Sequence, residues 1–333
     1  MVPRRSSPSA VIPVPKVVVT DCDFGPPFSL EEAELRAVGA ELSVANSTNE
    51  DALIAAAAAA DGLLVQYARI TPRLMDAMPR CRVISRYGIG MDMIDLAGAQ
   101  ARGIICCNVP VFCVSEVADH VLALLLNLAR HVTRLDSSVR EGVWNVREVA
   151  PGCERLDGQT LGLIGLGKIA QAVAVRARAF GMRVIAHSPR APESVFRNAE
   201  VTPVELDDLL RTADFVSIHT PLRAQTWHLI GSAELGRMKS AAFLINSARG
   251  PVVDTDALAQ ALETGAIAGA ALDVLEQEPM PKDSPLLSLP NLIITPHAAF
   301  YSKTSLTILR SETAAEVARV LSGQPPRSPV VPD

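Results

Sequence analysis

The stretch Thr160–Arg190 constrains the fold of this chain more than any other part of it. Leu161–Leu166 is a short apolar run of the length of a buried parallel strand, and it leads into Gly165–Ala170, with the sequence Gly-Leu-Gly-Lys-Ile-Ala. Apolar residues then recur at helical spacing until Gly181, after which Arg183–His187 predicts a second strand. The stretch therefore predicts one βαβ unit.

The turn inside this unit has the glycine spacing of a dinucleotide-binding loop, GxGxxA. Gly165 allows the tight turn, Gly167 lets the backbone approach a pyrophosphate, and Ala170 lets helix and strand pack closely. Lys168 and Ile169 complete the turn at the start of the helix, where free N–H groups and the helix dipole favour phosphate. We therefore expect a dinucleotide cofactor at this turn.

The whole chain is predicted to form two domains. Its 333 residues exceed one ordinary core, and short strands alternate with helices on both sides of the glycine turn. The predicted fold class is α/β, with two doubly wound parallel sheets. A Rossmann cofactor domain, residues 109–298, is inserted into a flavodoxin-like substrate domain, residues 16–108 and 299–333. Residues 1–15 are predicted to be a disordered extension, and Ser302–Leu321 a helix that returns to the first domain.

Composition argues against several classes of function. The net charge is −5, and no basic cluster occurs beyond Arg4 and Arg5, which speaks against a nucleic-acid surface. No apolar run reaches the roughly 18 residues of a membrane span. The six cysteines show neither a CxxC pair nor the Cys/His spacing of a metal site. We therefore expect reduced thiols, no metal and a cytoplasmic protein.

Polar residues of complementary chemistry follow the last strands of the cofactor domain. Arg249 comes after the strand AAFLINS, Asp273 and Glu278 come after IAGAAL, and His297 comes after NLIIT. Because ligands bind at the carboxyl ends of parallel strands, these side chains are predicted to converge where a nicotinamide would lie. An Arg can hold a carboxylate bidentately, and a His beside a carboxylate can donate the proton that accompanies a hydride. The set predicts hydride transfer to a 2-oxo acid.

Five motifs, in order and spacing, resemble the D-isomer-specific 2-hydroxyacid dehydrogenases: Gly165–Ala170, His219–Leu222, Asn246–Asp254, Asp273–Pro279 and Thr295–Ala299. Two segments, SRYGIGMDMID and PHAAFYS, are similar to the branch that holds the C-terminal-binding proteins and their bacterial relatives. The resemblance implies an NAD(P)-dependent oxidoreductase acting on a small 2-oxo or 2-hydroxy acid. It also implies that Arg249, Glu278 and His297 are the catalytic residues.

The same resemblance implies further binding residues. The cofactor set gains four members of the matching motifs, the last of them against the nicotinamide carboxamide: Thr220, Pro221, Ala248 and Asp273. The substrate set combines backbone groups that hold the carboxylate with side chains that line a partly apolar pocket: Ile89, Gly90, Tyr67, Arg249 and Phe300. A homodimer is expected, with some apolar surface of a long helix over residues 114–131 serving a subunit or domain contact.

The chain departs from the common pattern of these dehydrogenases in places that bear on its ligands. An NAD-binding fold usually has an acid about 20 residues past the glycines, which holds the ribose 2′-OH. Here the second strand ends in His187-Ser-Pro-Arg. Ser188 and Arg190 can bond a 2′-phosphate, so NADP is slightly favoured, with NAD bound through weaker ribose contacts as the alternative. Ala68 stands where phosphoglycerate dehydrogenases often have an Arg, which disfavours a phosphorylated substrate.

The other histidines are expected to be less important, and two other functions are weighed. His219 ends a strand and is placed beside the cofactor, whereas His120, His131 and His228 are expected in packing, solvated or loop positions. The main alternative is a dinucleotide-sensing binding protein of the co-repressor type, with little catalytic activity. Such a sensor would not need all three catalytic residues, so the enzyme is favoured. Formate-type hydride transfer lacks support because a glutamate beside the histidine suits proton donation.

Overall fold

The computed structural model describes residues 14–332, so residues 1–13 of the predicted extension lie outside the described residues. The described residues divide into two compact units. The first holds the residues up to Phe112 and from Lys303 onward, and the second is Cys113–Ser302. The sequence placed each domain boundary four residues earlier, after residues 108 and 298.

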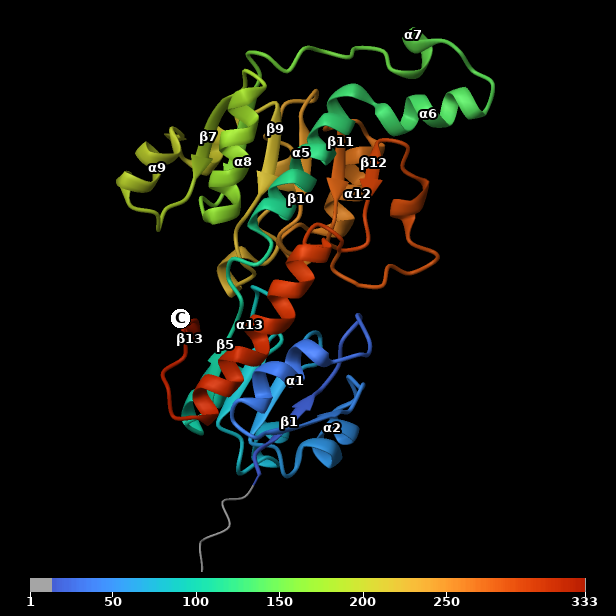
Figure 1. The fold of residues 1–333 in the computed structure, drawn as a ribbon. Coiled ribbons are helices and arrows are strands. Elements are labelled where there is room, and N and C mark those ends of the chain that lie inside the picture. Colours follow the sequence, from blue (N-terminus) through green and yellow to red (C-terminus); the bar gives the residue numbers. More distant parts are fainter. Residues whose placement is uncertain (1–13, 333) are drawn as a thin grey trace, which may run out of the picture. The chain divides into compact units, whose positions relative to one another are not determined.

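The first unit is a sheet with helices on both faces (Figure 1). Its strands are β1 Lys16–Val19, β2 Glu41–Val44, β3 Gly62–Val65, β4 Val83–Arg86, β5 Ile105–Cys107 and β13 Pro329–Val330. Its helices are α1 Ser29–Arg36, α2 Glu50–Ala57, α3 Pro72–Asp76, α4 Leu96–Ala101 and α13 Lys303–Leu321. The strand order is β13-β5-β4-β3-β1-β2, with β13 antiparallel to β5. Apart from β13, which the sequence did not predict, this is the flavodoxin-like order.

Both faces of this first sheet are covered by apolar side chains. Leu53 of α2, Leu74 of α3 and Ile84 of β4 belong to one buried cluster. On the other face, α13 packs along α1 and over β3 and β4, with Leu309 and Val317 buried. The last helix therefore packs within the first unit.

The second unit is a larger parallel sheet. Its strands are β6 Thr160–Ile164, β7 Arg183–His187, β8 Thr202–Pro203, β9 Phe215–Ile218, β10 Phe243–Asn246, β11 Gly269–Leu272 and β12 Leu292–Ile294. Its α-helices are α5 Val114–Arg130, α6 Val132–Arg140, α7 Val146–Val149, α8 Lys168–Ala179, α9 Glu193–Ala199, α10 Leu206–Thr212, α11 Ser232–Leu235 and α12 Thr255–Glu263. Three short 3₁₀ turns occur at η1 Ala224–Thr226, η2 Gly250–Val252 and η3 Pro285–Ser288. The order β12-β11-β10-β9-β6-β7-β8 contains the Rossmann arrangement, which confirms the predicted fold class.

Both faces of the second sheet are covered by helices. The helices α5 and α8 pack together on one face (Figure 1), and α10, α11 and α12 close a cluster on the other. Leu244, Leu209 and Leu258 are fully or almost fully buried in that cluster. Strands covered on both faces give continuous apolar runs in the sequence, which is why they could be predicted.

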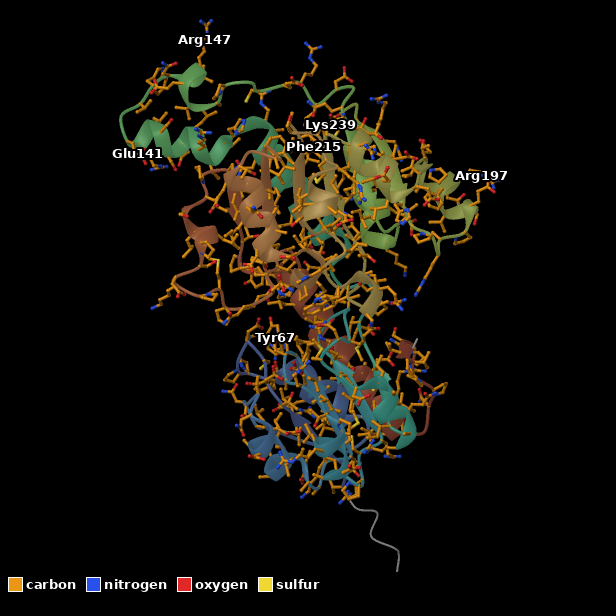
Figure 2. All side chains as sticks on the ribbon, turned by 180° about the vertical axis from the view of Figure 1, so that it is seen from behind. Tyr67, Glu141, Arg147, Arg197, Phe215 and Lys239 are labelled. Carbon is orange, nitrogen blue, oxygen red and sulfur yellow. The ribbon has the colours of Figure 1, made fainter. Side chains whose placement is uncertain are left out.

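A helical arm, residues 132–149, leaves the body of the second unit. The predicted helix over residues 114–131 is α5, which ends at Arg130. His131 follows with a φ of +52°, and after it come α6 and α7, which the sequence did not predict. Figure 1 shows α6 and α7 extending from the end of α5, and Figure 2 labels Glu141 and Arg147 at the edge they form. No residue of α6 is buried. The apolar face of α5 itself is buried within its own unit.

Several general properties follow from the described residues. None of their helices is long and apolar enough to cross a membrane. All six cysteines are free thiols. No group of three or more His, Cys, Asp and Glu side chains in the described part of the chain is arranged to hold a metal ion.

Candidate active site

The glycine turn joins β6 to α8 in the middle of the second sheet, where the strand order reverses. Gly165 has a φ of +95°, and a Cβ there would stand 2.8 Å from the carbonyl oxygen of His219, so the position requires glycine. Apart from chain neighbours, no described atom lies within 4 Å of where a Cβ of Gly167 would be. No side chain caps the N-terminus of α8. The turn thus offers open backbone N–H groups, and it fits the pyrophosphate of a dinucleotide.

The neighbouring strand end completes this edge of the sheet. Thr220 follows β9, and its backbone nitrogen would lie 3.1 Å from a Cβ on Gly165. His219 Nε2 lies 2.9 Å from Ser217 Oγ, and burial lowers the pKa of His219 to about 4. The imidazole is therefore neutral at neutral pH, which suits a residue that lines the cofactor rather than a proton donor. The remaining predicted cofactor residues of this edge are exposed or half-buried: Lys168, Ile169, Pro221 and Ala248.

The end of β7 carries the residues predicted to meet the ribose. The backbone turns directly after the strand, where the N–H of Ala191 donates to the carbonyl of Ser188 at 3.0 Å. Ser188 is half-buried and Arg190 is exposed. Neither side chain is a carboxylate, so this strand end offers a hydroxyl and a cation to a ligand.

Arg249 is positioned by a buried asparagine. Asn246, the last residue of β10, accepts from the N–H of Ala248 at 3.0 Å and donates to the carbonyl of Arg249 at 2.9 Å. A Cβ on Gly250 would stand 1.9 Å from the backbone of Leu275, so only glycine lets the two loops approach. The loop that carries Arg249 therefore packs against the loop that carries Glu278.

The predicted catalytic His and Glu form a direct pair. His297 Nδ1 lies 2.8 Å from Glu278 Oε2, and Glu278 Oε1 accepts from the N–H of Leu275 at 2.9 Å. Burial raises the pKa of the Glu278 carboxyl. The hydrogen bond and charge of His297, the Leu275 N–H and the charge of Arg249 outweigh this effect, so the pKa lies below its ordinary value. An ionised Glu278 accepts from Nδ1 and leaves Nε2 of His297 as the nitrogen that can exchange a proton.

Asp273 fixes the backbone of the turn that carries His297. Its side chain is 1% exposed, and its carboxylate accepts from the N–H groups of Ala298 and Ala299, each at 2.9 Å, and from Thr295 Oγ1 at 2.5 Å. The N–H of His297 donates to the Asp273 carbonyl at 2.8 Å, and the φ of His297 is +50°. The contact of Asp273 with a nicotinamide carboxamide stays a prediction, whereas its role in shaping the turn is visible.

Two histidines that the sequence analysis placed among structural positions also contact this region. His228 Nε2 lies 3.0 Å from Glu276 Oε2, and Glu276 Oε1 accepts from the N–H of Thr255 at the start of α12. This pair braces the loop between Asp273 and Glu278. His120 Nε2 lies 3.0 Å from Thr295 Oγ1. No local signal in the sequence marks either contact, since the partners lie 48 and 175 residues away.

The predicted substrate residues lie in both units. In the first, Tyr67 donates its hydroxyl to Asp23 Oδ2 at 3.0 Å, and the carbonyl of Ile89 accepts from Asn108 Nδ2 at 2.7 Å. Gly90 follows on the same loop and is half-buried. In the second, the ring of Phe300 lies edge-on to His297, with 6.2 Å between ring centroids. Their contacts with substrate stay predictions.

The fold and the site together define a class of protein. The second unit is a Rossmann sheet with an open glycine turn. An Arg and a His–carboxylate pair lie at the carboxyl edge of this sheet. This combination is typical of an oxidoreductase that uses a nicotinamide dinucleotide.

Comparison with known proteins gives the family. A model described as D-isomer specific 2-hydroxyacid dehydrogenase, NAD binding domain, matches residues 122–299. A glyoxylate reductase of Korarchaeum cryptofilum is 43% identical over 254 residues, which are 76% of this chain and 75% of the relative. A D-3-phosphoglycerate dehydrogenase of Methanocaldococcus jannaschii is 36% identical over 93% of this chain, which spans 58% of that relative. The NADPH-dependent glyoxylate/hydroxypyruvate reductase of Sinorhizobium meliloti, solved with NADP and malonate, has a TM-score of 0.84 and 30% identity, over 95% of this chain and 96% of that one.

The chain belongs to the D-isomer-specific 2-hydroxyacid dehydrogenase family. It is an enzyme that uses a nicotinamide dinucleotide and acts on small 2-hydroxy or 2-oxo acids. The family predicted from the sequence is thereby confirmed. The closer resemblance to the C-terminal-binding proteins stays a prediction.

Proposed function

We propose that this enzyme reduces a 2-oxo acid to the D-2-hydroxy acid, or catalyses the reverse reaction, through Arg249, Glu278 and His297. The observation that carries the proposal is the 2.8 Å contact between His297 Nδ1 and Glu278 Oε2. It holds the imidazole in the orientation of a proton donor, at the same edge of the sheet as the open glycine turn. A protein that only sensed dinucleotides would gain nothing from such a pair.

Each catalytic side chain has a separate task. Arg249 binds the substrate carboxylate with its planar guanidinium and polarises the adjacent carbonyl. The nicotinamide, when bound, supplies or accepts the hydride. His297 gives its Nε2 proton to the developing alkoxide during reduction and takes a proton back during oxidation. Glu278 stays ionised and stabilises the protonated imidazole throughout.

A panel of 2-oxo acids, assayed with NADH and NADPH, tests the reaction. We expect turnover of at least one member, with the D enantiomer as product. Unphosphorylated acids should be the better substrates, because Ala68 is buried where an Arg would be needed to meet a phosphate. Coenzyme binding without turnover of any 2-oxo acid would instead favour the sensing alternative.

The preferred coenzyme is NADP. The support is the end of β7, where Ser188 and Arg190 stand in place of the acid that usually binds the ribose 2′-OH. Hydrogen bonds to charged groups contribute ~1.5–3 kcal/mol and exposed ion pairs ~1 kcal/mol or less. Together they give NADPH an advantage of about tenfold to a hundredfold.

Exchanging Ser188 for Asp should reverse this preference. The new carboxylate would hydrogen-bond the ribose 2′-OH of NADH and repel the phosphate of NADPH. The measurement is kcat/KM for both coenzymes in wild type and Ser188→Asp, with Ser188→Ala as the variant that removes the hydroxyl without adding charge. A wild type that prefers NADH, with a ratio unmoved by Ser188→Asp, would show that this strand end does not recognise the ribose.

The arm, residues 132–149, is the subunit contact of a homodimer. It carries apolar side chains that its own unit leaves exposed, Val132, Val139, Val146 and, at 88%, Trp144. Several exposed apolar side chains in one segment favour an interaction surface, and tryptophan is enriched at the centres of such surfaces. The charged side chains of the arm are of both signs, so two copies of the arm can meet without a repulsion between like-charged faces. A second copy of the chain is therefore the partner that we propose.

Sedimentation or light scattering of the dilute enzyme tests the arm. We expect twice the chain mass of 35.4 kDa for wild type and a shift toward the monomer for Trp144→Ser. Trp227→Ser is the matched control, because Trp227 is also exposed but lies outside the arm. A wild-type monomer, or a dimer insensitive to the Trp144 change alone, would exclude the arm as the contact.

A further inference from the structure

His120 contacts the two residues that shape the catalytic turn. It lies in the middle of α5, far in sequence from the site. Its Nε2 is 3.0 Å from Thr295 Oγ1 and 3.4 Å from Asp273 Oδ1, and its side chain is 23% exposed. The buried residues of this helix are all apolar. This half-buried imidazole thus makes both of its contacts with the polar side chains that support the turn carrying His297.

The directions of the hydrogen bonds follow from the donor inventory. The Asp273 carboxylate can only accept, so the Thr295 hydroxyl must donate its single proton to it at 2.5 Å. Thr295 Oγ1 is then an acceptor toward His120, which means that Nε2 of His120 carries a proton. The same N–H faces Asp273 Oδ1. The hydrogen bonds from His120 and Thr295, with those from Ala298 and Ala299, also hold the pKa of Asp273 below its ordinary value against the opposing effect of burial.

We propose that His120 is a positioning residue for catalysis, which acts on His297 through Thr295 and Asp273. Its N–H fixes the orientation of the Thr295 hydroxyl and stabilises the charge on Asp273. The charged Asp273 in turn holds the N–H groups of residues 298 and 299, and its carbonyl holds the N–H of His297. The inference rests on the proposed role of His297 and extends the site onto α5.

The position of His297 depends on this chain of contacts because its backbone is in the left-handed region, with a φ of +50°. This conformation is uncommon for residues other than glycine, although histidine adopts it more readily than most, and the surrounding hydrogen bonds help to hold it here. Loosening the contacts behind the turn should let the imidazole drift from Glu278 and from the substrate. Small misplacements of a reacting group cost up to about a hundredfold in rate.

The test uses two substitutions of the full-length enzyme. His120→Leu keeps the bulk and removes the donor, and we expect kcat to fall about tenfold to a hundredfold while the Kd for the coenzyme changes less than about threefold. His120→Gln keeps an amide N–H near the position of Nε2 and should recover most of the loss. Asp119→Asn is the control on the same helix, because it removes only an exposed ion pair with Arg176. Equal losses in His120→Leu and His120→Gln, or no loss in kcat, would overturn the proposal.

A double-mutant cycle with Thr295→Val identifies the route. If His120 acts through the Thr295 hydroxyl, the double variant should lose no more kcat than the worse single variant. If the fold-losses in kcat of the two single variants multiply in the double variant, His120 acts by another path, and the proposal is wrong. His297→Ala separates this failure from that of the proposed function. An active His297→Ala enzyme would remove the mechanism itself, whereas an inactive one beside an unaffected His120→Leu would remove only the role of His120.

Discussion

Replacement of His297 by Ala is expected to lower kcat by about 10²–10⁴, the usual range for the loss of a general acid or base. The variant keeps the glycine turn, so its Kd for the coenzyme should stay near that of wild type. Steady-state kinetics and coenzyme titration measure the two effects separately. Wild-type turnover in this variant would take His297 out of the mechanism.

The matched variant Glu278→Gln keeps the imidazole and removes the carboxylate. The pKa of the Glu278 carboxyl is below its ordinary value. The negative charge of Glu278 is therefore fully present at pH values above the ordinary pKa, and it is lost only as the pH falls through the lowered pKa. Wild-type reduction should therefore keep its ion pair well into the acid range. In the Gln variant the imidazole binds its proton less tightly, and the alkaline limb of the reduction profile should move to lower pH. An unmoved profile would make Glu278 a structural residue.

The second large effect is expected for Arg249→Lys, which should lower kcat/KM by about a hundredfold to a thousandfold. Lysine keeps the charge but loses one of two hydrogen bonds to the carboxylate, ~1.5–3 kcal/mol, and part of the polarisation of the carbonyl. Because Arg249 is proposed to contact both the carboxylate and the carbonyl of the substrate, KM should rise and kcat should fall together. A Lys variant with only one of these changes would limit Arg249 to binding or to catalysis.

The affinity for the coenzyme is the control measurement for Arg249→Lys. The guanidinium donates to the carbonyl of Ala248 at 2.7 Å, so a disturbed loop is a second explanation for any loss of activity. Asn246 holds that loop independently through Ala248 and the Arg249 carbonyl. Coenzyme affinity should therefore stay unchanged, and a parallel loss of coenzyme binding would show that the loop had moved.

The core of both sheets could be predicted because its signals are local. Strands buried on both faces give unbroken apolar runs, as in Thr160–Ile164, and the glycine turn has a fixed spacing. The parallel arrangement then brings Arg249, Glu278 and His297 to strand ends of one sheet edge. Their convergence follows from topology, and the 2.8 Å pair between Glu278 and His297 is one instance of it.

The features that the sequence did not show depend on distant partners. No residue of α6 is buried, so this helix is not part of the core pattern from which the other helices were predicted. The strand β13 has two residues and exists only by pairing with β5. The contacts of His120 and His228 require helices and loops to be packed first. A histidine among apolar neighbours on a helix gives no sign of whether its nitrogen will meet a threonine or water.

The division of the chain into two units has a consequence for how such an enzyme can change. Arg249, Glu278, His297 and the glycine turn all lie within the uninterrupted segment Cys113–Ser302, and so does His120. Tyr67, Ile89 and Gly90, three of the five residues predicted to bind the substrate, are encoded outside it, whereas Arg249 and Phe300 are encoded within it. Mutations at these three positions can thus retune the choice of acid without changing the residues proposed to move the proton. Recombination at the two junctions would exchange these three positions together and leave the proposed catalytic residues in place.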